Sequence, residues 1–152
     1  MSSPAAIEAA TTRGGPVRQN ARITGGVMLL LGVLGLIPGI TTNYDELGIY
    51  RSGAQLFGVF QVSVLSSTLF LLYGVTILAF AGSVRQAHKS SVLHALLLIG
   101  MGVAAWGIVQ NSPAPLLPAD GASSLLYLLL GIVFLVTSNR ARAREVEQNG
   151  IF

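Results

Sequence analysis

Four long apolar stretches, separated by gaps of unequal charge, constrain this chain more than any other feature of its sequence. The stretches cover residues 23–40, 55–82, 91–110 and 121–138. Eight of the nine basic residues lie before the first stretch, between the second and third, or after the fourth: Arg13, Arg18, Arg22, Arg85, Lys89, Arg140, Arg142 and Arg144. Because basic residues are retained on the cytoplasmic side of a membrane, this distribution predicts four spans with both termini in the cytoplasm.

The composition excludes a water-soluble bundle. Only 10% of the residues are charged and the mean hydropathy is +0.68, whereas soluble domains carry about 25% charged residues. A soluble helix also needs a polar face, and residues 27–39 and 125–136 offer none. The runs are continuous and too few for a barrel. The predicted fold class is therefore all-α, an integral membrane four-helix transmembrane bundle.

The chain divides into three predicted parts. Residues 1–22 are rich in Ala, Ser, Thr, Gly and Pro, which is typical of a disordered cytoplasmic tail. Residues 23–138 form the membrane domain, in which the uncharged second stretch is expected to be a helix that tilts or extends beyond the outer interface. A short basic inner loop, residues 83–90, precedes the third helix. Residues 139–152 are expected to form a helical cytoplasmic tail.

A stripe of small residues marks the first stretch. Gly25, Gly32 and Gly39 recur every seven residues, and Gly35 lies four before Gly39. Small residues let helix backbones approach closely in a membrane. The stripe is a candidate helix-packing surface, used either inside the bundle or for association with a second copy or a partner.

Polar residues gather at two places near the outer side of the membrane. The loop of residues 41–54 is a candidate contact surface through Asn43, Tyr44, Asp45, Glu46 and Arg51; alternatively its tyrosines anchor it at the membrane interface. The second stretch carries a polar stripe, Gln61, Ser63, Ser66 and Ser67. None of these four side chains ionises, so the stripe favours hydrogen bonds between helices.

The sequence offers no set of residues for catalysis or for metal binding. The chain has no cysteine, and no charged residue lies within a span. The two histidines, His88 and His94, have no nearby carboxylate that would complete a metal site. The excess of basic residues is explained by their positions next to the predicted spans, and no nucleic-acid-binding motif accompanies them. We therefore predict no enzyme activity, no cofactor and no nucleic-acid partner.

The segment from Ile37 to Asp45, followed by Ser52 to Leu65, reads IPGITTNYD and SGAQLFGVFQVSVL. It resembles a family of small four-helix membrane proteins of bacteria, frequent in actinobacteria and described only as a domain of unknown function. The resemblance implies four spans and a home in the bacterial plasma membrane. Members often carry His-Asn and a further His where this chain has Ser66, Ser67 and Phe70.

The two halves of the chain also resemble each other faintly. Residues 71–73 and 125–127 both read Leu-Leu-Tyr, and residues 29–31 and 96–98 both read Leu-Leu-Leu. Duplication of a hairpin is one explanation, and chance matching of Leu-rich helices is the other.

The pattern as a whole favours an accessory or structural subunit that contacts lipid and larger membrane proteins or itself. The alternative is an oligomeric small channel or transporter lined by the polar face of the second span.

Overall fold

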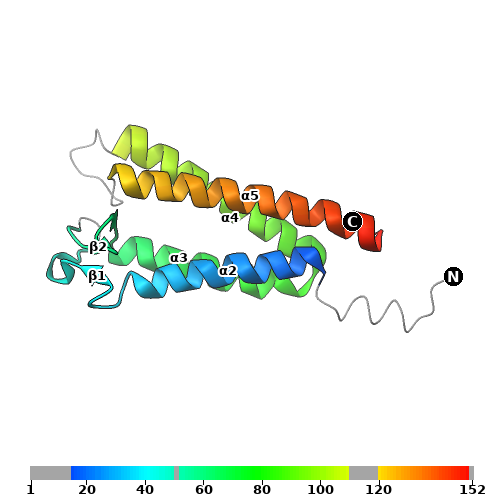
Figure 1. Cartoon of the computed structure of the whole chain (residues 1–152), viewed down its shortest axis with the longest axis horizontal. Coiled ribbons are helices and arrows are strands. Elements are labelled where there is room, and N and C mark those ends of the chain that lie inside the picture. Colours follow the sequence, from blue (N-terminus) through cyan, green and yellow to red (C-terminus); the bar gives the residue numbers. More distant parts are fainter. Residues whose placement is uncertain (1–14, 50–51, 110–119, 151–152) are drawn as a thin grey trace.

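The computed structural model describes residues 15–49, 52–109 and 120–150. Four helices run side by side: α2 (Pro16–Leu34), α3 (Val64–Ala79), α4 (Val84–Ala104) and α5 (Gly121–Asn149). The helices α2 and α3 form one antiparallel hairpin, and α4 and α5 form a second (Figure 1). The hairpins meet mainly through α2, which lies against both α5 and α4, and also through α3, which contacts α4. The predicted all-α four-helix bundle is confirmed.

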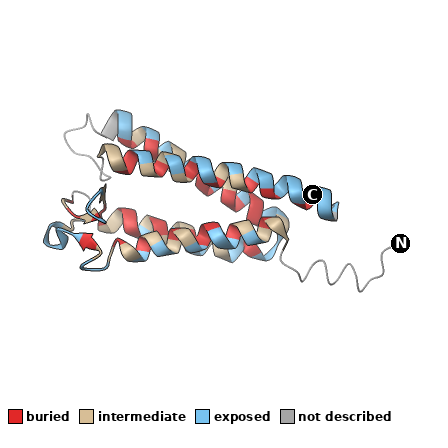
Figure 2. Cartoon of the chain, in the orientation of Figure 1, coloured by how far each residue is buried: buried red, intermediate tan, exposed pale blue. Residues whose placement is uncertain are grey.

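Three of these helical segments are long and apolar enough to cross a membrane: Val64–Gly82, Val84–Gly107 and Gly121–Gln148. Large apolar side chains remain exposed on the outside of the bundle, as at Leu30 (57% exposed), Leu72 (57%) and Leu129 (60%). Exposed positions run along the outer sides of the helices, and buried positions line the surfaces between them (Figure 2). Lipid is the solvent that suits such an exterior. The chain is a multi-pass membrane protein.

The first helix is displaced from the predicted span. It begins at Pro16, so residues 16–22 of the predicted tail are helical, while residues 1–14 lie outside the described part. Proline suits the first helical position because its missing N–H would have no partner there. The helix ends at Leu34, and Pro38 and Gly39, which has φ +93°, turn the chain away. Residues 35–40 of the predicted span are not helical.

The predicted second span was wrong at its outer end. Residues 55–61 form two strands, β2 (Gln55–Leu56) and β3 (Phe60–Gln61), which join β1 (Thr41–Thr42) in an antiparallel sheet of order β1-β2-β3. The register pairs Thr42 with Gln55 and Leu56 with Phe60. The chain reverses at Phe57 and Gly58, which have φ +55° and +70°. Apolar residues here serve a short sheet rather than a helix.

The predicted inner loop, residues 83–90, was also wrong. A single 3₁₀ turn, Phe80–Gly82, joins α3 to α4, and α4 begins at Val84. The Ser83 side chain accepts a hydrogen bond from the Gln86 N–H at 3.3 Å, which satisfies one of the free donors at the helix start. The helix continues as a π turn over Ala105–Val109. The fourth helix begins at Gly121, after the N-cap residue Asp120, whose side chain accepts a hydrogen bond from Ser123 N–H at 2.8 Å. It extends through the predicted tail to Asn149.

The core lies where the two hairpins meet. Its largest fully buried side chains include Met28, Phe70, Ile77, Leu98 and Tyr127. The rings of Phe70 and Tyr127 meet edge to face with centroids 5.7 Å apart, a favourable geometry for aromatic pairs. A second, smaller cluster contains Ala54, Leu56 and Val62 and packs against Leu34 at the end of α2 and Phe60 of β3.

Candidate functional site

The glycine stripe of α2 packs inside the chain. A Cβ at Gly32 would lie 2.7 Å from Leu71 Cγ and 2.8 Å from the Ser67 carbonyl oxygen of α3. Gly25 faces Leu78 and Gly35 faces Ser67. Gly39 has no atom within 4 Å of its Cβ position and serves the chain reversal instead. Three of the four glycines therefore allow α2 and α3 to approach, and their face is not available to another protein.

The predicted polar stripe is divided between two elements: Gln61 lies in β3, whereas Ser63, Ser66 and Ser67 lie at the start of α3 and face the interior. Ser63, Ser66 and Ser67 are 0%, 0% and 1% exposed. Ser63 and Ser66 form a reciprocal cap: Ser66 N–H donates to Ser63 Oγ at 3.1 Å, and Ser63 N–H donates to Ser66 Oγ at 2.9 Å. Such a capping box satisfies two donors that the helix leaves free. These hydroxyls begin α3 rather than line an outer surface.

The hydroxyls of α5 complete a buried polar cluster with those of α3. Ser123 and Ser124 are both 0% exposed, and Ser123 Oγ donates to the Gln61 carbonyl at 3.0 Å. The Tyr127 hydroxyl lies near Ser66 but makes no hydrogen bond among the described atoms. Among described atoms, Ser67 Oγ has no hydrogen-bond partner. The cluster joins α5 of the second hairpin to the start of α3 in the first. The Asp120 carboxylate lies at its edge, where it accepts a hydrogen bond from Ser123 N–H at 2.8 Å.

The outer loop forms a folded cap over the end of α2. Asn43 adopts a left-handed backbone (φ 52°) before a 3₁₀ turn over Tyr44–Glu46. The Tyr44 hydroxyl donates to the Leu36 carbonyl at 3.1 Å, and the Glu46 carbonyl accepts from Ser52 Oγ at 3.3 Å. The cap fixes its backbone while leaving the side chains of Asp45 and Glu46 exposed. Arg51, the remaining predicted contact residue, lies outside the described residues.

The cap also exposes apolar side chains that the sequence analysis did not single out. Ile49 is 62% exposed, Phe57 59% and Val59 52%. Phe57 combines exposure with a positive φ, which is unusual for a bulky residue. Together with the acidic pair, these side chains give the cap a mixed surface suited to contact with another protein.

At the opposite end of the bundle, one acid joins the hairpins. Glu145 is 2% exposed, and its Oε2 accepts a hydrogen bond from Val17 N–H at 3.1 Å. A Cβ at Gly15 would overlap its carboxyl group. A carboxylate at a helix N-terminus is stabilised by the helix dipole. The sequence places Glu145 only in the predicted cytoplasmic tail, because nothing in the local sequence shows that its partner lies 128 positions away.

The histidines are bonded to nearby groups on the second hairpin. His94 Nδ1–H donates to the Ser90 carbonyl, one turn earlier, at 2.7 Å, and its ring meets Tyr73 edge to face at 4.9 Å. His88 Nδ1 lies 3.1 Å from Ser138 Oγ on α5. Within the described residues, no three acidic or imidazole side chains gather to hold a metal ion.

The fold and these contacts define a class: a multi-pass helical membrane protein with a folded cap at one end of its bundle. The chain belongs to the family described as Domain of unknown function (DUF4383), whose model matches residues 18–139. Comparison with curated proteins and with solved structures finds no match.

Proposed function

We propose that this protein is a non-catalytic accessory subunit of the bacterial plasma membrane, which contacts larger integral membrane proteins or further copies of itself. The observation that carries the proposal is the inward orientation of the polar residues in the spans. Ser63, Ser66, Ser123 and Ser124 are fully buried and their hydroxyls are bonded within the chain. A bundle of this kind is complete by itself and presents an apolar exterior to lipid or to other helices.

Two surfaces remain for partners. One is the apolar outside of the helices, which suits van der Waals packing between spans. The other is the cap, which exposes both the acidic side chains of Asp45 and Glu46 and the apolar side chains of Phe57 and Val59. Aromatic side chains are enriched among the residues that dominate protein interfaces. We assign the cap as the surface that recognises a particular partner, and the helix exterior as the surface that packs against neighbouring spans.

The proposal includes four crossings with both termini in the cytoplasm. Although α2 falls outside the three segments that satisfy length and apolarity, its glycine face packs along α3. A helix bound in this way must share the depth of its neighbour. The basic residues of α2, α4 and α5 then lie at one end of the bundle, as retention of positive charge on the inside requires.

The alternative, an oligomeric channel lined by the second span, has weaker support. Its pore would have to be lined by Ser63, Ser66 and Ser67, but α2 and α5 cover these residues within a single chain. Thr68 is exposed, yet its hydroxyl donates to its own backbone at Val64 O, 2.7 Å away. A hydroxyl occupied in this way contributes little to an ion pathway.

Site-directed photo-crosslinking tests the assignment of the cap. A photoreactive residue at Phe57 is expected to capture a larger membrane protein in intact cells, after mild extraction and native-gel separation. The same group at buried Leu98 is the matched control and should capture nothing. Homo-oligomers that conduct ions in liposomes, with no crosslinked partner, would contradict the accessory role.

Cysteine labelling tests the topology, because the natural chain has no cysteine. Asn43→Cys in the cap should react with a membrane-impermeant maleimide in intact cells. Gln148→Cys, near the end of α5, should react only after the cells are opened. Labelling of Gln148→Cys from outside would reverse the proposed orientation.

A further inference from the structure

A polar cavity opens where the first turns of α2 lie against the last turns of α5. Its volume is about 340 Å³, and its lining includes Gln19, Asn20 and Ile23 from α2 and Thr137, Arg140 and Arg144 from α5. Cavities of a few hundred Å³ are large enough for small ligands or for part of a larger one. The outer cap and the buried hydroxyl cluster take no part in it.

The lining presents cationic donors. Arg140 and Arg144 are four residues apart on α5, so their side chains share one face of the helix. Neither guanidinium has a hydrogen bond or an ion pair with any residue that the structure describes. The side-chain nitrogen of Asn20 is buried and likewise lacks an acceptor among the described atoms. Donors without acceptors around one cavity fit an anion, and arginine binds phosphate with two parallel hydrogen bonds.

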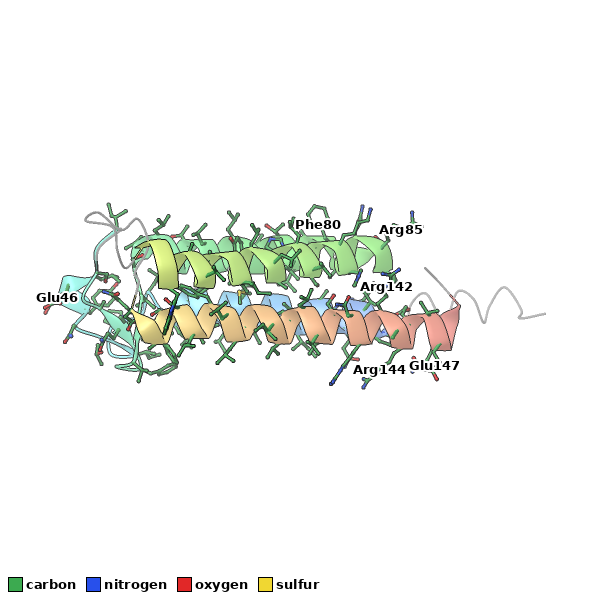
Figure 3. The ribbon with its side chains drawn as sticks, turned by 90° about the horizontal axis from the view of Figure 1, so that it is seen from above. Glu46, Phe80, Arg85, Arg142, Arg144 and Glu147 are labelled. Atoms are coloured by element: carbon green, nitrogen blue, oxygen red, sulfur yellow. The ribbon has the colours of Figure 1, made fainter. Side chains whose placement is uncertain are left out.

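Not every charged residue at this end of the bundle points toward the cavity. Figure 3 shows Arg144 on the side of α5 away from α4, whereas Arg142 lies on the side that faces α4. The neighbouring acid in the chain, Glu145, is buried with its Oε2 bonded to Val17 N–H. Its carboxylate is thus engaged in the contact with α2.

The cavity lies where the polar ends of α2 and α5 meet the apolar stretches of these helices. Ile23 begins the apolar stretch of α2 and is 59% exposed, and Thr137 lies at the end of the apolar stretch of α5. One end of the cavity therefore lies at the depth of acyl chains and the other at the depth of headgroups. A ligand that is anionic at one end and apolar at the other fits both ends, whereas a free anion fits only the basic end.

We propose that this cavity binds the phosphate headgroup of an anionic phospholipid, with its acyl chains passing Ile23 into the membrane. Basic pockets between membrane helices recognise such headgroups. The inference depends on the membrane setting of the bundle and not on an accessory role.

Native mass spectrometry with dioleoyl-phosphatidylglycerol tests this site on the full chain, using dioleoyl-phosphatidylcholine as the neutral comparison. The first phosphatidylglycerol should bind at least tenfold more tightly than phosphatidylcholine. Because each arginine would donate charge-assisted hydrogen bonds to the bound phosphate, the double variant Arg140→Gln/Arg144→Gln should lose affinity by at least about 30-fold. The matched variant Arg85→Gln/Lys89→Gln removes the same charge from α4, outside the cavity, and should lose less than about threefold.

Equal losses in the two double variants would overturn the proposal, because they would show diffuse attraction to charge. A second variant, Gln19→Trp, fills the cavity without changing the charge and should weaken phosphatidylglycerol binding at least tenfold. Unchanged binding in Gln19→Trp would refute the site even if the arginine variant failed to fold. Displacement of the lipid by millimolar sodium phosphate would assign the cavity to a soluble phosphate compound and overturn the lipid assignment.

Discussion

The contact between Glu145 and the start of α2 yields a quantitative prediction. Glu145 is 2% exposed and accepts from Val17 N–H at 3.1 Å. Hydrogen bonds to charged groups contribute about 1.5–3 kcal/mol, and a carboxylate at a helix N-terminus adds about 0.3–1 kcal/mol through the dipole. Glu145→Ala also leaves a donor without its acceptor. We expect a loss of about 2–3 kcal/mol in the free energy of unfolding.

Two further variants separate the parts of this effect. Glu145→Gln keeps an acceptor oxygen but removes the charge, so it should lose about 1 kcal/mol. Glu147→Ala removes an exposed acid two residues further along the same helix and should change stability by less than about 0.5 kcal/mol. Unfolding by sodium dodecyl sulfate in mixed micelles, followed by circular dichroism, gives the three values. If Glu145→Ala were no more destabilising than Glu147→Ala, the contact between Glu145 and Val17 would not stabilise the fold, which would refute our reasoning.

Three other predictions use the same unfolding measurement. Gly32→Leu should lower the free energy of unfolding by about 1–3 kcal/mol because its side chain would overlap the α3 backbone. Gly26→Leu is the control and should change stability little, because no atom lies within 4 Å of the Cβ position. Equal effects of the two variants would contradict the close contact between the helices. Ser123→Ala should cost about 1 kcal/mol through the lost hydrogen bond to Gln61, and no loss would argue against that link. Phe57→Asn should be neutral or stabilising by up to about 1 kcal/mol, since asparagine tolerates a positive φ; marked destabilisation would show that the Phe57 ring supports the cap.

The apolar stretches were sufficient to predict four helices but not their ends. Hydropathy identifies the part of a helix that lies in lipid and says little about turns that extend into water. Residues 16–22 and 84–90 are polar and helical, and capping by Ser83 is the local signal that we missed. Residues 55–61 are apolar but form strands, because short apolar runs do not distinguish strand from helix.

For the candidate sites too, the sequence showed one part and not the other. Most residues of the polar stripe and of the small-residue stripe were visible in the sequence because they recur at helical spacing, although Gln61 lies in β3 and Gly39 lies beyond the end of α2. The long-range partners were not visible, because Ser123 and Tyr127 meet the polar stripe from α5 and Glu145 meets the start of α2 across the bundle. Long-range pairing is a property of the packed hairpins and leaves no trace in local spacing.

Close packing within the two hairpins follows one pattern. A glycine on each helix accepts the side chain and backbone of one residue from its neighbour: Gly32 with Leu71, Gly74 with Leu29, Gly102 with Leu128 and Gly131 with Ile99. In every helix the contacting Leu or Ile precedes the glycine by three positions. The return helices also begin alike, with Ser63 and Asp120 as their side-chain caps.

This pattern corrects the register of the internal similarity. The sequence had paired Leu71 with Leu125, but the glycine contacts make Leu71 equivalent to Leu128, one helical turn later. Leu-rich helices match in several registers, and only the glycines distinguish between them. In the corrected register Phe70 is equivalent to Tyr127, and these two rings touch. Contact between equivalent residues is what a two-fold axis between parallel hairpins produces, so the packing supports duplication over chance similarity.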